Sequence, residues 1–211
     1  MSLLDELLDR TKGMEPEALE QLSQDAADII GNRAWIPNPG PQTQAYISEA
    51  DIILYGGRAG GGKTHLELGW GINGAERGII FRRELTQTDG IEDEGKKIIG
   101  ESASFNGTDH EWTRPSGKSL KLGAMSGAND WMKHAGRERD YMAFDEAGEF
   151  LEQQVASIMA WLRAAPGKRT RVVLASNPPR TSDGFWLLEW FAPWLDPKHP
   201  DPADPGELRL S

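Results

Sequence analysis

The stretch GGRAGGGKT at residues 56–64 is the strongest signal for chemistry in this sequence. Gly57, Gly62, Lys63 and Thr64 fill the spacing GxxxxGK[ST], with a predicted strand before them and a predicted helix after them. Glycines allow positive φ and close backbone approach, so that consecutive N–H groups can point at phosphate oxygens. We expect Lys63 to contact the β- and γ-phosphates of a nucleoside triphosphate and Thr64 to offer its hydroxyl to Mg²⁺. The alternative is a glycine-rich turn with a solvated lysine. The residues predicted to hold the nucleotide here are Gly57, Ala59, Gly60, Gly61, Gly62, Lys63 and Thr64.

An acidic pair lies about eighty residues downstream, in YMAFDEAGEF. Asp145 and Glu146 follow an apolar run that predicts a buried strand. We expect Asp145 to hold Mg²⁺, directly or through water, and Glu146 to orient or deprotonate the water that attacks the γ-phosphate. An acidic pair at a strand end is also a common helix N-cap, and that interpretation remains the alternative.

A third polar group follows the apolar run of VVLASNPP. Polar residues at the carboxyl end of a central parallel strand lie in the ligand crevice of an open α/β sheet. Ser176 and Asn177 are therefore predicted to contact the γ-phosphate or its water and to report hydrolysis. A turn made of ordinary turn residues is the alternative.

Short β-rich runs alternate with helical stretches from Asp51 onward, which predicts an α/β fold with a mostly parallel sheet. The segment EWTRPSGKSLKLGAM between the second and third runs predicts an inserted antiparallel β-hairpin. The four expected strands cover residues 52–55, 79–82, 141–144 and 171–175.

The two ends of the chain differ from this middle part. Apolar spacings of three and four predict two short amphipathic helices within residues 1–31, and residues 32–44, rich in Pro, Gly and Asn, predict an extended connector. The segment GFWLLEWFAPW predicts one helix with an aromatic face on the sheet, and residues 196–211 predict a proline-rich linker. We expect a helical arm at 1–34, the main domain at 35–195 and the linker at 196–211.

Composition excludes several functions. With 23 basic and 33 acidic residues the net charge is −10, which argues mildly against a strong DNA binder. The chain has no cysteine, and its four histidines show no metal-ligand spacing, so a zinc site is not expected. The sequence has no stretch of about 20 apolar residues and no signal peptide, so we expect no membrane association and a cytosolic location.

In their order along the chain, four segments make this sequence resemble the ATPase domain of the large terminase subunit, the motor that packages DNA into tailed-phage capsids. The resemblance runs from about residue 35 to 209, and implies a three-layer P-loop NTPase fold of the RecA-like (ASCE) type. The segments that carry it are WIPNPGPQTQAYISEADIILYGGRAGGGKT, GIIFRRELTQTDG, GRERDYMAFDEAGEF, and VVLASNPP with GFWLLEWFAPWLDPKHPDPADPGELR.

Further residue roles are implied by this resemblance. Gln42 matches a glutamine that recognises adenine, with an exposed loop glutamine as the alternative. Arg58 matches a phosphate-loop arginine that follows the γ-phosphate or contacts a neighbouring subdomain. Relatives often place an arginine just before the glycine that is here Gly136, whereas this chain has an alanine there. An arginine finger acting on a neighbouring subunit is then Arg137 or Arg139, or it lies elsewhere. Both residues are ordinary surface charges in the alternative interpretation.

The resemblance also implies partners and context. These are ATP and Mg²⁺, double-stranded DNA, a portal protein, a small terminase subunit, and a ring of identical chains, pentameric when assembled and monomeric for this chain alone. The expected location is the cytoplasm of an infected bacterial host. The family's second half is a nuclease domain, which this chain lacks, so we expect no nuclease activity. Two alternatives stay open: a helicase-type or recombination-type ATPase, and a nucleotide-gated assembly module.

Two groups of basic residues could also touch DNA phosphates, although a solvated face is the default interpretation. They are Arg82, Arg83, Lys96 and Lys97, and then Lys168, Arg169 and Arg171.

Overall fold

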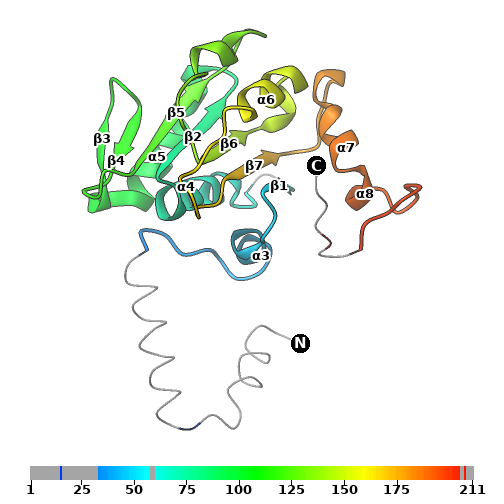
Figure 1. Cartoon of the computed structure of the whole chain (residues 1–211), viewed down its shortest axis with the longest axis horizontal. Helices are drawn as coiled ribbons and strands as arrows, with labels where there is room; N and C mark the ends of the chain where they lie inside the picture. Colours follow the sequence, from blue (N-terminus) through cyan, green and yellow to red (C-terminus); the bar gives the residue numbers. More distant parts are fainter. Residues whose placement is uncertain (1–14, 16–32, 58–59, 205–206, 208–211) are drawn as a thin grey trace.

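The computed structural model describes residue 15 and residues 33–57, 60–204 and 207. Within them, helices cover both faces of a central sheet (Figure 1). The sheet has seven strands in the described part of the chain, in the order β1-β7-β6-β2-β5-β4-β3. The expected α/β fold with a mostly parallel sheet is therefore confirmed.

The strands that carry the predicted site are all parallel. β1 (Ile52–Gly56) pairs with β7 (Arg171–Ser176), β7 with β6 (Tyr141–Asp145), and β6 with β2 (Arg77–Arg82). β2 pairs in parallel with β5 (Ser119–Ala124). Because parallel strands end at one edge, the phosphate loop after β1, the acidic pair after β6 and the polar turn after β7 meet there.

The expected hairpin is present. β4 (Glu111–Thr113) pairs antiparallel with β5, and β3 (Ser104–Asn106) extends it as a further antiparallel strand.

Alternation along the strands fills two apolar cores. Tyr141 and Ala143 of β6 face a core that includes Leu68 and Ile72 of α4 (Lys63–Gly74), together with residues of α5 (Asp89–Ile99). Met142 and Phe144 face the opposite core, built with α6 (Glu152–Met159) and α7 (Trp186–Trp190). This gives the expected three layers and leaves the sheet edge free for a site.

Two sequence expectations need correction. The connector predicted over residues 32–44 is not extended throughout, because α3 (Pro41–Ile47) begins within it. Gly40 takes φ 99° and Pro41 lies in the first turn, where its missing N–H costs no helical hydrogen bond. The predicted aromatic helix is split into α7 and α8 (Ala192–Leu195), with Pro193 in the first turn of the second.

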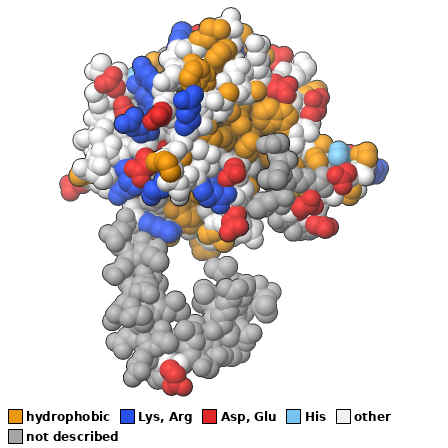
Figure 2. Space-filling view, viewed as in Figure 1, with side chains coloured by type: hydrophobic (Ala, Val, Ile, Leu, Met, Phe, Trp, Pro, Cys, Tyr) orange, Lys and Arg blue, Asp and Glu red, His pale blue; other side chains and the backbone are white. Residues whose placement is uncertain are grey.

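The aromatic segment buries only one part of its face. Trp186 and Leu187 are buried, and the rings of Trp186 and Trp190 lie 4.8 Å apart, whereas Trp194 is 40% exposed. Hydrophobic side chains gather around α7 on the face shown in Figure 2. Residues 196–204 form turns and bends without helix or strand, and their role as a linker stays a prediction.

The helices predicted within residues 1–31 lie outside the described residues, and the boundaries proposed at 34/35 and 195/196 stay predictions. None of the helices in the described part of the chain combines the length and apolar character needed to cross a membrane.

Candidate nucleotide site

A cleft of about 700 Å³ opens at the carboxyl edge of the sheet. Its walls come from the phosphate loop, α3, α4 and the ends of β2, β6 and β7. This volume is within the range of about 300–1,000 Å³ typical of small-molecule sites. The residues predicted from sequence that line it are Gln42, Gly60, Gly61, Gly62, Lys63, Thr64, Asp145, Glu146 and Asn177.

The phosphate loop has the backbone that its glycines permit. Gly57, Gly60 and Gly62 have φ of 142°, 84° and 72°, which L-residues with a Cβ rarely adopt. Gly62 is followed directly by Lys63 at the start of α4, so the positive end of this helix dipole faces the cleft. Arg58 and Ala59, which we predicted to contact phosphates, lie outside the described residues.

A chain of hydrogen bonds links the three predicted motifs. Lys63 Nζ donates to Asn177 Oδ1 at 3.0 Å and to the Gly57 carbonyl at 3.3 Å. Asn177 Nδ2 in turn donates to Glu146 Oε1 at 3.1 Å. Asn177 therefore holds the lysine and the glutamate at one place, although they lie 83 residues apart in sequence (146 − 63).

Glu146 has a strained backbone. Its φ of 56° and ψ of 53° place it in the left-handed region, which non-glycine residues seldom occupy. Such strain is concentrated at functional sites, where surrounding contacts hold it in place. Here the 3₁₀ turn Ala147–Glu149 follows, and its Gly148 N–H donates to Ser176 Oγ at 3.1 Å.

Ser176 and Asn177 thus differ in position. Ser176 is buried, and its hydroxyl donates to the Asn177 carbonyl at 2.6 Å while accepting from Gly148. It does not line the cleft, whereas Asn177 does. Ser176 fixes the turn after β6, and of the two only Asn177 is placed to contact a nucleotide.

Asp145 and Thr64 are the groups that fit Mg²⁺. Asp145 is buried, and burial is the main cause that raises the pKa of its carboxyl, while the Arg82 guanidinium opposes that shift. The described residues hold no group of three or more His, Asp or Glu that would bind a metal alone. One carboxylate, one hydroxyl and phosphate oxygens are the usual Mg²⁺ ligands of such a site, with water completing the shell.

Gln42 is not the exposed loop glutamine of our alternative interpretation. It is buried on α3, where Nε2 donates to the Gly62 carbonyl at 2.9 Å and Oε1 accepts from the Asn38 N–H at 2.6 Å. A Cβ at Gly62 would lie 2.6 Å from Nε2. Gln42 therefore braces the phosphate loop and retains one N–H and one lone pair, so adenine recognition stays a prediction.

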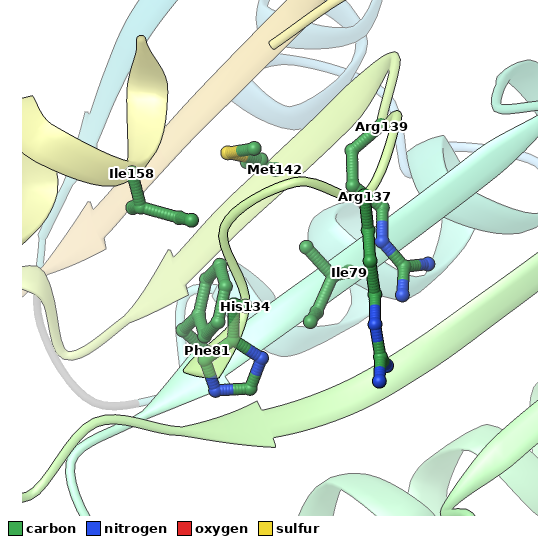
Figure 3. A pocket seen from close by; sticks show the side chains of 7 residues that line it. All are labelled: Ile79, Phe81, His134, Arg137, Arg139, Met142 and Ile158. Carbon is green, nitrogen blue, oxygen red and sulfur yellow. The ribbon is translucent and has the colours of Figure 1, made fainter. Parts of the chain in front are cut away.

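The two candidate finger arginines lie over a sheet face, beside Ile79, Phe81 and Met142 (Figure 3). Arg139 is 8% exposed, and its Nη1 donates to the Gly78 carbonyl at 3.0 Å. A guanidinium bound inside its own domain cannot reach a neighbouring subunit in this conformation, which argues against Arg139. Arg137 is exposed and stays a prediction.

Two ionisable residues at or next to the site were not predicted from sequence. Arg82 lines the cleft, with Nε 3.4 Å from Asp145 Oδ2, although we had grouped it with possible DNA contacts. Glu67 lies one turn after Lys63 on α4 and is fully buried, and neither of its oxygens has a hydrogen-bond partner. The i, i+4 spacing from Lys63 was the one sequence signal for Glu67.

Several of the remaining basic residues that we grouped as possible DNA contacts pair with acidic residues of the chain, as Arg169 does with Asp51. Lys96 and Lys97 pair with Glu92 and Glu94 on α5.

Among solved structures, the chain is similar to the large terminase of bacteriophage HK97, with a TM-score of 0.56 at 12% identity over 77% of this chain. Two structures of the large terminase from the thermophilic bacteriophage D6E match with TM-scores of 0.47 and 0.45, identities of 16% and 17%, and coverage of 66% and 64% of this chain. The second D6E structure is a complex with ADP. No family model matches the sequence, and no curated protein matches it significantly.

These matches cover 36%, 36% and 37% of the terminase chains, so this chain spans little more than a third of their length. At such low identity, the HK97 similarity establishes the fold: the described domain has the α/β architecture of the matched part of a phage large terminase.

Proposed function

We propose that this chain is the Mg²⁺-dependent ATPase domain of a phage large terminase, and that its ATP hydrolysis drives movement of double-stranded DNA into a procapsid. The observation that carries the proposal is the hydrogen-bonded chain from Lys63 through Asn177 to Glu146 in one cleft. A binding module has no need of a carboxylate held beside its phosphate-binding lysine.

In this proposal, each residue of the cleft has a separate role in ATP hydrolysis. Lys63 and the loop N–H groups hold the β- and γ-phosphates and stabilise charge that develops on the transferred phosphoryl group. Glu146 accepts a proton from the attacking water, and Asn177 fixes the orientation of that carboxylate. Thr64 and Asp145 would hold Mg²⁺, which would supply positive charge beside the phosphate oxygens.

Coupling to movement is assigned to the turn after β7. Asn177 contacts both Lys63 and Glu146, so a change at the γ-phosphate alters the position of the segment that follows. That segment leads through Pro178 and Pro179 to α7. DNA, a portal protein, a small terminase subunit and a ring of identical chains are the proposed partners, with Arg137 as the residue that reaches a neighbouring site.

The test compares hydrolysis with movement on DNA. ATP turnover is measured for the wild type, for Lys63→Ala, and for Lys133→Ala, an exposed lysine whose loss should change nothing. Wild-type protein is then given duplex DNA that carries a third strand. A duplex translocase displaces the third strand and leaves the duplex intact, whereas a helicase separates the duplex strands. Turnover that survives Lys63→Ala contradicts the ATPase assignment, and strand separation contradicts packaging.

A further inference from the structure

Arg82 is a charged group of the cleft that the proposed mechanism does not use. It is the last residue of β2, and its carbonyl accepts from the Met125 N–H at 3.1 Å, so the backbone at its position is held by the sheet. Its side chain is 20% exposed and lines the cleft together with Lys63, Thr64, Asp145 and Glu146.

The Arg82 guanidinium has unused donors. Nε lies 3.4 Å from Asp145 Oδ2, but this ion pair lacks hydrogen-bond geometry, and both Nε and Nη1 are buried without a hydrogen-bond partner among the described residues. A buried donor left unsatisfied destabilises a folded protein, more so when it is charged. Two such donors on one side chain indicate an acceptor that enters the cleft.

The carboxylates nearby are poor candidates for that acceptor. Asp145 is the predicted Mg²⁺ ligand, and Glu146 already accepts from Asn177. Glu67 is fully buried and does not line the cleft, and neither of its oxygens accepts a hydrogen bond from Arg82. A phosphate group instead matches the planar fork of an arginine, which binds two oxygens at once.

Strand order indicates which phosphate this is. Lys63 follows β1, at one end of the row β1-β7-β6-β2, and Arg82 ends β2 at the other end of that row. Asn177 and Glu146 follow the two strands between them, β7 and β6. The phosphate that lies nearest to Glu146 is the one attacked by water, so it lies between Lys63 and Arg82.

On the basis of the proposed function, we propose that Arg82 binds the terminal phosphate of the bound triphosphate and acts on it within its own subunit. The guanidinium then places positive charge beside the oxygens on which charge develops during hydrolysis. Arg82 thus makes the cleft distinguish a triphosphate from a diphosphate.

The test measures binding of MgADP and of the non-hydrolysable magnesium complex of β,γ-imido-ATP by titration calorimetry. Arg82→Gln should weaken binding of the imido-triphosphate by about tenfold to a hundredfold, the range for a lost hydrogen bond to a charged group, with much less change for ADP. Arg82→Lys should restore part of the loss. Arg83→Gln is the matched control, because Arg83 Nη1 donates instead to Gln154 Oε1 at 2.6 Å and does not line the cleft.

Equal losses for both nucleotides in Arg82→Gln and Arg82→Lys would mean that Arg82 only supports the fold of the cleft, and would overturn the inference. So would unchanged binding of the triphosphate. Wild-type protein that binds neither nucleotide would instead overturn the proposed function itself, which separates the two failures.

Discussion

Polar residues at the two edges of the central sheet differ in how far their hydrogen-bonding groups are satisfied within the chain. At the amino edge, Asp140 precedes β6 and accepts from the N–H groups of Glu76 and Arg77 at 2.8 and 2.9 Å. Arg139 donates to Gly78, and Arg171 donates to the Ser48 carbonyl at 2.7 Å. Arg171 also lies 4.2 Å from the Trp70 ring centroid, although its Nη1 has no hydrogen-bond partner.

At the carboxyl edge, the polar groups at and beside the strand ends include one strained backbone and several donors and acceptors without hydrogen-bond partners. Glu146 is strained, Arg82 has two unused donors, and the Glu67 carboxyl beneath them has two unused oxygens. Polar groups at the amino edge therefore stabilise the fold, while those at the carboxyl edge are arranged at a cost in stability. Such a cost is expected where a site is preorganised for a ligand or a reaction.

Among substitutions that distinguish the two edges, Glu146→Gln at the carboxyl edge should have the largest effect, a loss of ATP turnover. The amide keeps an oxygen for Asn177 Nδ2 but cannot accept the proton of water, so the nucleotide should bind and persist. Turnover should fall about a hundredfold or more, which is at least about 2.7 kcal/mol of barrier. Single-turnover hydrolysis and nucleotide titration measure the two properties separately.

Glu149→Gln, an exposed neighbour on the same turn, is the control and should hydrolyse at the wild-type rate. If Glu146→Gln loses binding as well as turnover, the residue is structural and our division of roles is wrong.

The sequence predicted the parts of this site that depend on local pattern. Apolar β-rich runs marked the strands, and GxxxxGK[ST] marked the loop, because both signals lie within a few residues. Arg82 was grouped with possible DNA contacts, with a solvated face as the default, because no local signal in the sequence shows that β2 ends beside Asp145. The proximity of Arg82 and Asp145 follows from the order of the strands in the sheet, and that order cannot be predicted from a single sequence.

The same reason explains two further differences. Gln42 was expected to recognise adenine or to lie exposed in a loop, and its hydrogen bonds to Asn38 and Gly62 were not expected. The contact with Gly62 spans 20 residues and exists only in the folded chain. Pro, Gly and Asn dominate residues 32–44, so the helix that begins at Pro41 was hidden among residues typical of connectors. Pro193 was a local signal that should have divided the aromatic helix.

At the amino edge the main effect should be on stability. Asp140→Ala removes the acceptor of two backbone N–H groups and should lower the free energy of unfolding by about 2–3 kcal/mol. For a chain of this size that corresponds to a fall in Tm of roughly 4–12 °C. Nucleotide affinity of the folded protein should not change. Glu138→Ala, two residues earlier and exposed, should leave Tm unchanged. A loss of ATP affinity in Asp140→Ala without a lower Tm would remove the distinction between the edges.

Glu67→Gln should raise the free energy of unfolding at pH 7, by less than Asp140→Ala lowers it. Burial is the largest cause that raises the Glu67 pKa well above its usual value, followed by the negative charge of Asp145. The unfolded chain releases this proton near pH 4.3 while the folded chain keeps it, so the wild type loses stability as pH rises above that value. The neutral amide has no such loss and should therefore be more stable than the wild type at pH 7.

Urea unfolding of both proteins at pH 4 and pH 7 measures this effect, with the exposed Glu101→Gln as control. The advantage of Glu67→Gln should be near zero at pH 4 and should grow toward pH 7. An advantage that shrinks as pH rises would show that Glu67 is ionised in the folded protein.

The smallest expected effect is on nucleotide selectivity and concerns Gln42, which stabilises the phosphate loop and is also predicted to recognise adenine. If its remaining N–H and lone pair read the adenine edge, MgATP should bind about tenfold more tightly than MgGTP, because guanine reverses donor and acceptor there. Gln42→Ala should then bring the two affinities together. If the residue only braces the loop through Gly62, Gln42→Ala should weaken ATP and GTP by the same factor, and their ratio should stay as in the wild type. Titration of both nucleotides against both proteins therefore tells whether the Gln42 amide only stabilises the folded loop, as Asp140 stabilises the other edge of the sheet, or also contacts the base of the nucleotide.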